Sequence, residues 1–154
     1  MTSLDRCYNI FDLREAAMRR LPKGIFEYVD KGTEDGISLE ENRAAFQRIK
    51  LRTCFLNDWS QRDLGTEIFG QRIELPFGIA PTGSAGLMWY QGEVELARAA
   101  AAAGIPFTLA MGALTSMEEV TKAVPAARKR FQLYPCEDEE GDYEMVTGAR
   151  ELGW

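Results

Sequence analysis

Two polar side chains alternate with apolar ones in the run RFQLYP, residues 130–135, which has the composition of a β-strand. Successive side chains of a strand point to opposite faces. If Phe131 and Leu133 face a layer of helices, Gln132 and Tyr134 therefore face the other side of the sheet. An amide and a phenol are costly to bury without hydrogen-bond partners, so this pair indicates a binding site. A tyrosine whose hydroxyl is satisfied inside the core is the alternative.

Small residues follow another apolar run, in the segment ELPFGIAPTGSAG, residues 74–86. Because bulky side chains are absent, the backbone of Thr82 and Gly83 could contact a flat ligand, and Thr82 adds a hydroxyl group. A tight turn between a strand and a helix also favours Gly and Pro, and on spacing alone this turn is the preferred interpretation. The end of another strand, in LAMGALTS at 109–116, again consists of small residues. Ser116 is better explained as a helix cap than as a ligand-binding residue.

Several other kinds of site are excluded by spacing and charge. The acidic stretch CEDEEGDYE, residues 136–144, lacks the ligand spacing of an EF-hand, so we expect a solvated loop and no metal. Neither G-x-G-x-x-G nor G-x-x-x-x-G-K occurs, so no Rossmann or P-loop nucleotide site is predicted. The net charge of −6 argues against a nucleic-acid partner, which requires a basic face.

The composition predicts a reduced, cytoplasmic protein. The three cysteines are far apart and form no C-x-x-C pair, and the N-terminus has no signal peptide. The uncharged stretch at 99–114 is interrupted by Gly and Pro, so membrane association is not indicated in this portion. The sequence contains no histidine, the usual proton shuttle near neutral pH, so an enzyme would need another base or one outside this chain.

The first part of the chain predicts helices followed by a hairpin. Ser38 and Glu41 have the spacing of a capping box at the start of the last of these helices. The run 66–75 alternates around Gly70 and predicts a β-hairpin. The helices are predicted at residues 9–21, 22–32 and 38–49.

From residue 76 onward the pattern changes to alternating strands and helices. Ser116 and Glu119 form a second capping box. Such alternation implies a parallel sheet with right-handed crossovers. It fits either a small doubly wound sheet or the first units of a (β/α)₈ barrel, which needs ~250 residues. The strands are predicted at 77–81, 106–112 and 130–135, and the helices at 92–104, 116–124 and 142–153.

Five motifs occur in a characteristic order: LPKGIFEYVDKGTEDGISLEENRAAFQRIKL, LPFGIAPTG, GEVELARAAAAAGIPFTLA, SMEEV and FQLY. This combination resembles the N-terminal part of the FMN-dependent 2-hydroxy acid oxidases and dehydrogenases, which include glycolate oxidase, lactate oxidase and mandelate dehydrogenase. The segment GLMWYQGE is most similar to the mandelate dehydrogenase branch. The resemblance implies an α/β fold, with a helical segment and β-hairpin over 1–75. Residues 76–154 would form the first three βα units of a TIM (β/α)₈ barrel, incomplete at the C-terminus.

The resemblance also implies which residues contact the cofactor, FMN. The flavin would lie across the carboxyl ends of the strands, and Gln132 would hydrogen-bond its pyrimidine edge. Ala110 occupies the position of a serine that usually bonds the flavin in this family. The backbone that lies along the flavin ring would be that of Pro81, Thr82 and Gly83.

For the substrate, a small 2-hydroxy acid, the resemblance implies two tyrosines. Tyr134 would bond the substrate hydroxyl or carboxylate and help to stabilise the transition state, so it is the candidate catalytic residue. Tyr28 would bind the substrate carboxylate. Gly112 matches a position that is often bulkier and lines the substrate pocket, so a larger substrate could fit.

The implied reaction is oxidation of a mandelate- or lactate-like 2-hydroxy acid to the 2-oxo acid, while a base takes the hydroxyl proton. In the family that base is a histidine near an arginine, and both lie on later strands. We therefore expect a partial chain that is inactive alone. We also expect the full-length protein to be a homo-oligomer. A non-catalytic fragment that binds flavin or another protein is the alternative.

Overall fold

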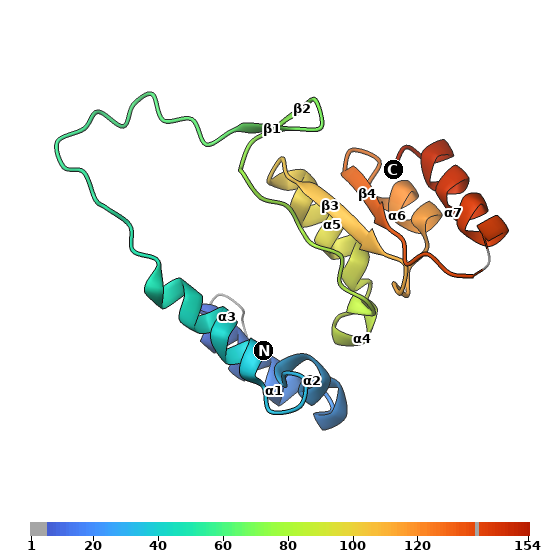
Figure 1. Cartoon of the computed structure of the whole chain (residues 1–154), viewed down its shortest axis with the longest axis horizontal. Coiled ribbons are helices and arrows are strands. Elements are labelled where there is room, and N and C mark those ends of the chain that lie inside the picture. Colours follow the sequence, from blue (N-terminus) through green and yellow to red (C-terminus); the bar gives the residue numbers. More distant parts are fainter. Residues whose placement is uncertain (1–5, 138) are drawn as a thin grey trace. The chain divides into compact units, whose positions relative to one another are not determined.

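The computed structural model describes residues 6–137 and 139–154. The chain divides into two compact units, Met1–Ser60 and Gln61–Trp154 (Figure 1). The first unit is helical. The second contains the β-hairpin, the parallel strands and the remaining helices, so each unit is described separately.

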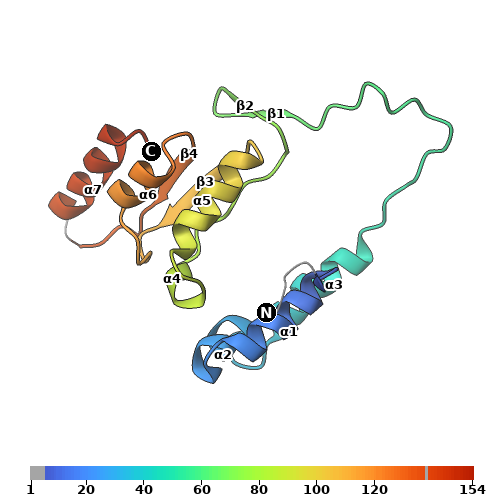
Figure 2. The same cartoon turned by 180° about the vertical axis from the view of Figure 1, so that it is seen from behind.

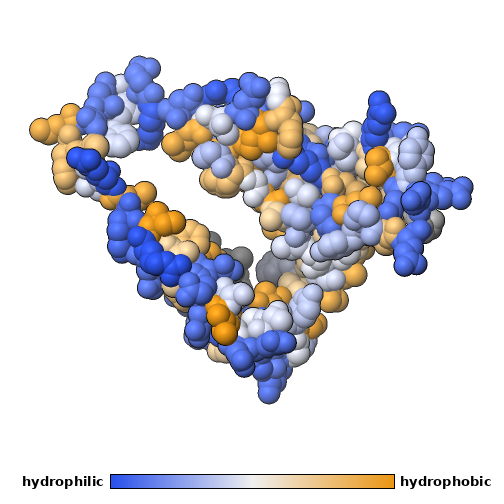
Figure 3. Space-filling view, in the orientation of Figure 1, coloured by the Kyte–Doolittle hydropathy of each residue, from blue (hydrophilic) through white to orange (hydrophobic). Residues whose placement is uncertain are grey.

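The first unit consists of α1 (Ile10–Arg20), α2 (Lys23–Asp30) and α3 (Ile37–Arg48), which confirms three predicted helices. The Asn9 side chain caps α1 by accepting a hydrogen bond of 3.0 Å from the Asp12 amide. Arg14 joins α1 to α2, because its Nη2 donates to Oδ2 of Asp30 at 2.7 Å. None of the three helices contains a buried residue, and Figure 3 shows apolar side chains at the surface of this region.

The predicted capping box on α3 is wrong. The helix begins at Ile37, and its N-cap is Gly36, which has φ +73° and no side chain to cap with. Ser38 therefore lies inside the first turn, where its hydroxyl cannot act as the N-cap. Glu41 instead forms an ion pair of 3.1 Å with Arg48.

The predicted hairpin is confirmed. Strands β1 (Thr66–Ile68) and β2 (Gln71–Ile73) pair antiparallel, and the two residues between them, Phe69 and Gly70, both have positive φ. Two left-handed residues give the turn whose twist suits a two-residue hairpin loop.

This hairpin is fixed to the amino ends of the parallel strands. The Glu74 amide donates to the Gly104 carbonyl at 3.3 Å, and the Arg128 guanidinium donates to the Arg72 carbonyl. The guanidinium carbon of Arg130 lies 4.7 Å from the centre of the Phe69 ring.

The parallel sheet consists of β3 (Pro106–Ala110) and β4 (Arg128–Gln132). The strand predicted at 77–81 is reduced to one bridge, in which the Ile79 amide donates to the Pro106 carbonyl and the Ile79 carbonyl accepts from the Thr108 amide. Pro76 and Pro81 flank this segment and lack the N–H groups that a longer ladder needs. The described residues form no closed barrel.

Four helices belong to the second unit: α4 (Ala85–Met88), α5 (Gly92–Ala102), α6 (Met117–Ala123) and α7 (Glu139–Glu151). The short α4 was not predicted, and α7 begins three residues before the predicted start at Asp142. The capping box of Ser116 and Glu119 on α6 is confirmed. None of the described helices is long and apolar enough to cross a membrane.

Helices α5 and α6 pack on one face of the sheet. Helix α5 lies behind β3 in Figure 1 and in front of it in the opposite view of Figure 2. Leu109 of β3 belongs to the core on this face, and Phe131 of β4 packs against that core. The buried core residues are Val94, Ala97, Ala100, Ile105, Phe107, Leu109, Val120, Val124 and Ala127.

Candidate functional site

Three chain segments meet at the carboxyl ends of the strands. The Ser84 amide donates to the Gly112 carbonyl at 3.0 Å, which joins the segment after Ile79 to the end of β3. The Met111 amide donates to the Gln132 carbonyl at 2.9 Å, which joins β3 to the end of β4. The strand ends that the sequence singled out therefore form one continuous edge, the place where ligands bind in α/β folds.

The first of these ends is open backbone. Pro81, Thr82 and Gly83 are all exposed, and the Thr82 hydroxyl makes no hydrogen bond within the described part of the chain. A methyl group added at Gly83 would lie 3.6 Å from the Gly112 carbonyl oxygen, whereas one added at Gly112 would meet nothing within 4 Å. A flat molecule could therefore contact main-chain atoms here without a side chain in its way.

Ala110 and Gln132 lie side by side as partners in the parallel register. Their sequence neighbours Leu109 and Phe131, also partners, face the helical layer. Because side chains alternate along a strand, Ala110 and Gln132 face the opposite side of the sheet. Ala110 is buried and Gln132 is half-buried, and the Gln132 amide has no hydrogen-bond partner among the residues that the structure describes.

The two candidate tyrosines occupy different units. Tyr134 follows β4 by two residues and is 69% exposed. Tyr28 is on α2 in the first unit and is 73% exposed. The structure thus places Tyr134 near the strand-end edge together with the five candidate flavin residues, and Tyr28 in the other unit. The roles of all these residues stay predictions.

Sequence reasoning missed Glu93, the one buried charged side chain in the described residues, with 1% of its surface exposed. Its carboxylate Oε1 accepts from the amides of Gly86 at 3.1 Å and Leu114 at 3.2 Å. Its Oε2 accepts from the Thr115 hydroxyl at 2.9 Å. The only sequence signal was an acidic residue in the first turn of a helix, which is also an ordinary exposed position.

The charge on Glu93 is stabilised by these donors. Burial acts to raise the pKa of Glu93, but hydrogen bonds from backbone amides and from the Thr115 hydroxyl outweigh it and hold the pKa below its ordinary value. The carboxylate is therefore ionised at neutral pH. Its contribution to stability is present above the ordinary glutamate pKa and is lost as the pH falls through the lowered one.

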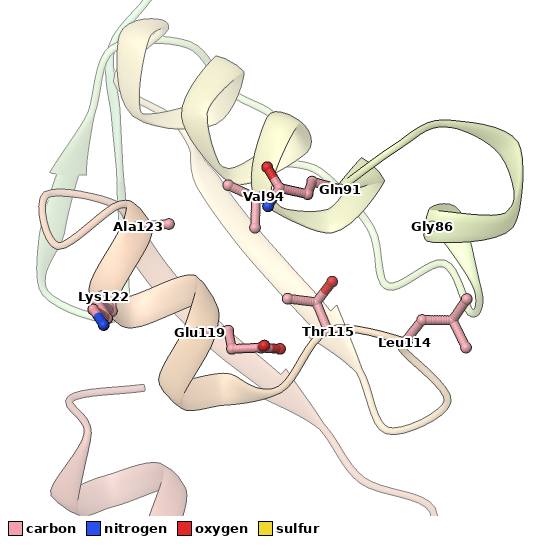
Figure 4. Close-up of a pocket in the computed structure, with 8 residues that line it drawn as sticks. All are labelled: Gly86, Gln91, Val94, Leu114, Thr115, Glu119, Lys122 and Ala123. Atoms are coloured by element: carbon pink, nitrogen blue, oxygen red, sulfur yellow. The ribbon is translucent and has the colours of Figure 1, made fainter.

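A cleft of about 620 Å³ is lined by Gly86, Leu114 and Thr115, which donate hydrogen bonds to this carboxylate (Figure 4). Val94 and Gln91 of the α5 region, Leu114 and Thr115 of the loop after β3, and α6 surround it (Figure 4). Glu119 and Lys122 of α6 line it too, so the cleft is polar on one side. Its lining includes Gly86 and Leu114 of the loops that follow the strand ends, but none of Pro81, Thr82 and Gly83.

Comparison with known proteins gives consistent matches. Residues 17–154 match the family described as FMN-dependent dehydrogenase. A putative L-lactate dehydrogenase of Mycobacterium tuberculosis is 42% identical over 151 residues, 98% of this chain and 36% of that protein. The (S)-mandelate dehydrogenase of Pseudomonas putida is 38% identical over 147 residues, 96% of this chain and 37% of that protein.

Solved structures agree with these matches. A mutant of the active chimera of (S)-mandelate dehydrogenase aligns with a TM-score of 0.90 and 36% identity, covering 97% of this chain and 42% of that one. This chain therefore spans about two-fifths of the length of the relatives that it matches.

Proposed function

Because the chain belongs to the FMN-dependent dehydrogenase family, we propose that it forms part of an enzyme that oxidises a 2-hydroxy acid to the 2-oxo acid. FMN, the cofactor of the family, would accept the hydride equivalent that leaves the substrate. In this proposal the segment around Ile79, β3 and β4 are the first three strands of a TIM barrel.

The observation that carries the proposal is the meeting of the small-residue strand ends with Gln132. The residues present fit a flavin, because the exposed backbone at Pro81–Gly83 admits a flat ring and the Gln132 amide, unpaired among the described residues, can bond its edge. An amide both donates and accepts, as the pyrimidine edge of an isoalloxazine requires. The side chain of Ala110, the register partner of Gln132, has no hydrogen-bonding group to offer the flavin.

The substrate would lie beyond the flavin edge, near Tyr134. The exposed phenol of Tyr134 can donate a hydrogen bond to the substrate carboxylate or to the substrate oxygen that gains charge in the transition state. Tyr28 would add a second hydrogen bond to the substrate carboxylate. The open space at Gly112 favours a bulky substrate side chain, such as the aromatic ring of a mandelate-like acid.

The proton-accepting base would come from outside these 154 residues. The sequence has no histidine, and the chain covers 36–42% of its relatives, so most of their residues have no counterpart here. We therefore expect this chain alone to bind FMN without oxidising a 2-hydroxy acid. The absence of histidine equally favours the second candidate, a flavin-binding chain without catalysis.

Titration of the purified chain with FMN, followed by flavin fluorescence and visible absorption, tests the cofactor site. We expect saturable binding that Gln132→Ala weakens about 2- to 10-fold, the effect of losing one ordinary hydrogen bond. Gln47→Ala, at an exposed position of α3, is the matched control and should leave binding unchanged.

Two results would contradict the proposed site. The first is no saturable FMN binding by a chain whose circular dichroism shows folded secondary structure. The second is an equal dissociation constant for Gln132→Ala and the unmodified chain, since the amide would then not contact the flavin.

A further inference from the structure

The segment between Gly83 and Gly92 is held in an unfavourable conformation. Ser84 and Gln91 have φ of +56° and +52°, the left-handed region that residues with a side chain rarely adopt. A methyl group at Gly92 would lie 2.4 Å from the Ala85 carbonyl oxygen, so the backbone packs against itself there. Such a conformation persists only when surrounding contacts fix it.

The Glu93 carboxylate supplies one contact within this segment, at the Gly86 amide. One oxygen holds the amide of Gly86 in this segment and the amide of Leu114 in the loop after β3. The other oxygen holds the Thr115 hydroxyl in that second loop. A buried ionised acceptor makes stronger hydrogen bonds than a neutral one, so the carboxylate ties the two loops to each other and to α5.

These two loops begin at the strand ends that carry the candidate flavin contacts. Gly83 and Gly112 are three and two residues from Gly86 and Leu114, respectively. The direct link between the loops, from Ser84 to the Gly112 carbonyl, is on the exposed side. The spacing between the loops is thus fixed from inside by the carboxylate and from outside by a solvent-exposed hydrogen bond.

We propose that Glu93 is a positioning residue that couples the loop after Ile79 to the loop after β3. This coupling would in turn set the affinity of the chain for FMN. That consequence rests on the function proposed above. Glu93 itself touches neither cofactor nor substrate in this proposal. It acts through the backbone positions of Gly83 and Gly112.

Three variants distinguish the effect of the hydrogen bonds to Glu93 from the effect of its charge and from the effect of truncating any glutamate on α5. Glu93→Gln keeps an oxygen for the two amides, and its NH₂ group can donate to Thr115, so the coupling should survive. Glu93→Ala removes the hydrogen bonds from Gly86, Leu114 and Thr115 and leaves these part-buried donors unsatisfied. Glu95→Ala, on the same helix but exposed and paired with Arg98, is the control.

Amide hydrogen exchange by NMR on the whole chain without flavin tests the coupling directly. We expect Glu93→Ala to speed exchange at least tenfold at Gly86 and Leu114 together, while the hairpin at 66–73 keeps its protection. Glu93→Gln and Glu95→Ala should stay within about threefold of the unmodified chain. Faster exchange at only one loop, or an equal loss throughout the unit, would overturn the proposal.

If Glu93→Ala does not fold, Thr115→Val keeps the proposal testable, because it removes one donor to the carboxylate with little change in shape. We expect faster exchange at Gly86, in the other loop, and unchanged exchange at Gly86 would overturn the coupling. FMN titration of the same samples separates the two ideas. Coupled exchange without FMN binding in any sample contradicts the cofactor site and leaves the coupling supported.

Discussion

The two units of this chain differ in how their helices are stabilised. In the first unit no residue of α1, α2 or α3 is buried, and aromatic side chains such as Phe11 and Phe46 are 66% and 85% exposed. In the second unit α5 alone has five buried residues, and three of them, Val94, Ala97 and Ala100, belong to the core that it shares with β3 and α6. The helices of the first unit therefore rest on local features, whereas those of the second rest on a shared core.

This difference shows that helical periodicity and burial are separate properties. The apolar residues at helical spacing in α1 correctly predict a helix, yet Ile10 is 75% exposed and Leu13 is 41% exposed. Caps and ion pairs suffice to define where such a helix begins and ends. Only contacts from distant parts of the chain decide whether its apolar side is covered.

The largest expected effect concerns the core of the second unit. Phe107 is 2% exposed and lies within the core beneath α5 and α6, so Phe107→Ala should lower the free energy of unfolding by about 3–5 kcal/mol. Phe46→Ala is the matched change in the first unit and should have little effect. Urea denaturation followed by fluorescence and circular dichroism measures both. Equal losses of unfolding free energy in Phe107→Ala and Phe46→Ala would contradict the view that only the second unit is stabilised by a buried core.

A smaller effect should follow from a methyl group at two glycines of the second unit. Gly92→Ala places a methyl 2.4 Å from a carbonyl oxygen and should destabilise by about 1–3 kcal/mol. Gly148→Ala, on α7 with nothing within 4 Å, should instead stabilise by about 0.5–1 kcal/mol through helix propensity. Thermal unfolding of both variants tests the opposite signs. Stabilisation by Gly92→Ala would show that the segment before α5 is not tightly packed.

The smallest effect should appear in the first unit, at the link between α1 and α2. The hydrogen bond from Arg14 holds the pKa of Asp30 below its ordinary value. Its contribution is therefore present above the ordinary aspartate pKa and is lost as the pH falls through the lowered one. NMR titration of the Asp30 carboxyl should show a higher pKa in Arg14→Ala than in the unmodified chain. Arg19→Ala, whose partner is Glu15, is the control and should not move it.

The parts of the fold that sequence predicts well are those set by neighbouring residues. Gly70 identifies the hairpin turn because a left-handed position suits it, and Ser116 with Glu119 defines the start of α6. The same local rule fails at Ser38, because Gly36 ends the preceding turn one residue before Ile37 and the helix starts too early for the serine to cap it. A capping pattern fixes a helix start only within a residue or two.

The candidate site was predictable to the same extent. Phe131 packs against the core of the helical layer, so alternation along RFQLYP puts Gln132 on the opposite face, and the register places it beside Ala110. Glu93 could not be identified, because its burial arises from Gly86 and Leu114, which lie 7 and 21 residues away. Burial of a charge depends on packing between segments, so the spacing of residues within one segment does not predict it.

The attachment of the hairpin to the amino ends of β3 and β4 has a practical consequence. Gly104 precedes β3 and Arg128 begins β4, so the hairpin and the strand-end edge lie at opposite ends of the same two strands. Glu67, exposed on β1, is then a position where a tether or a dye can be attached while the edge with Gln132 stays accessible. Immobilised through that residue, the chain would present its carboxyl-end edge to solution.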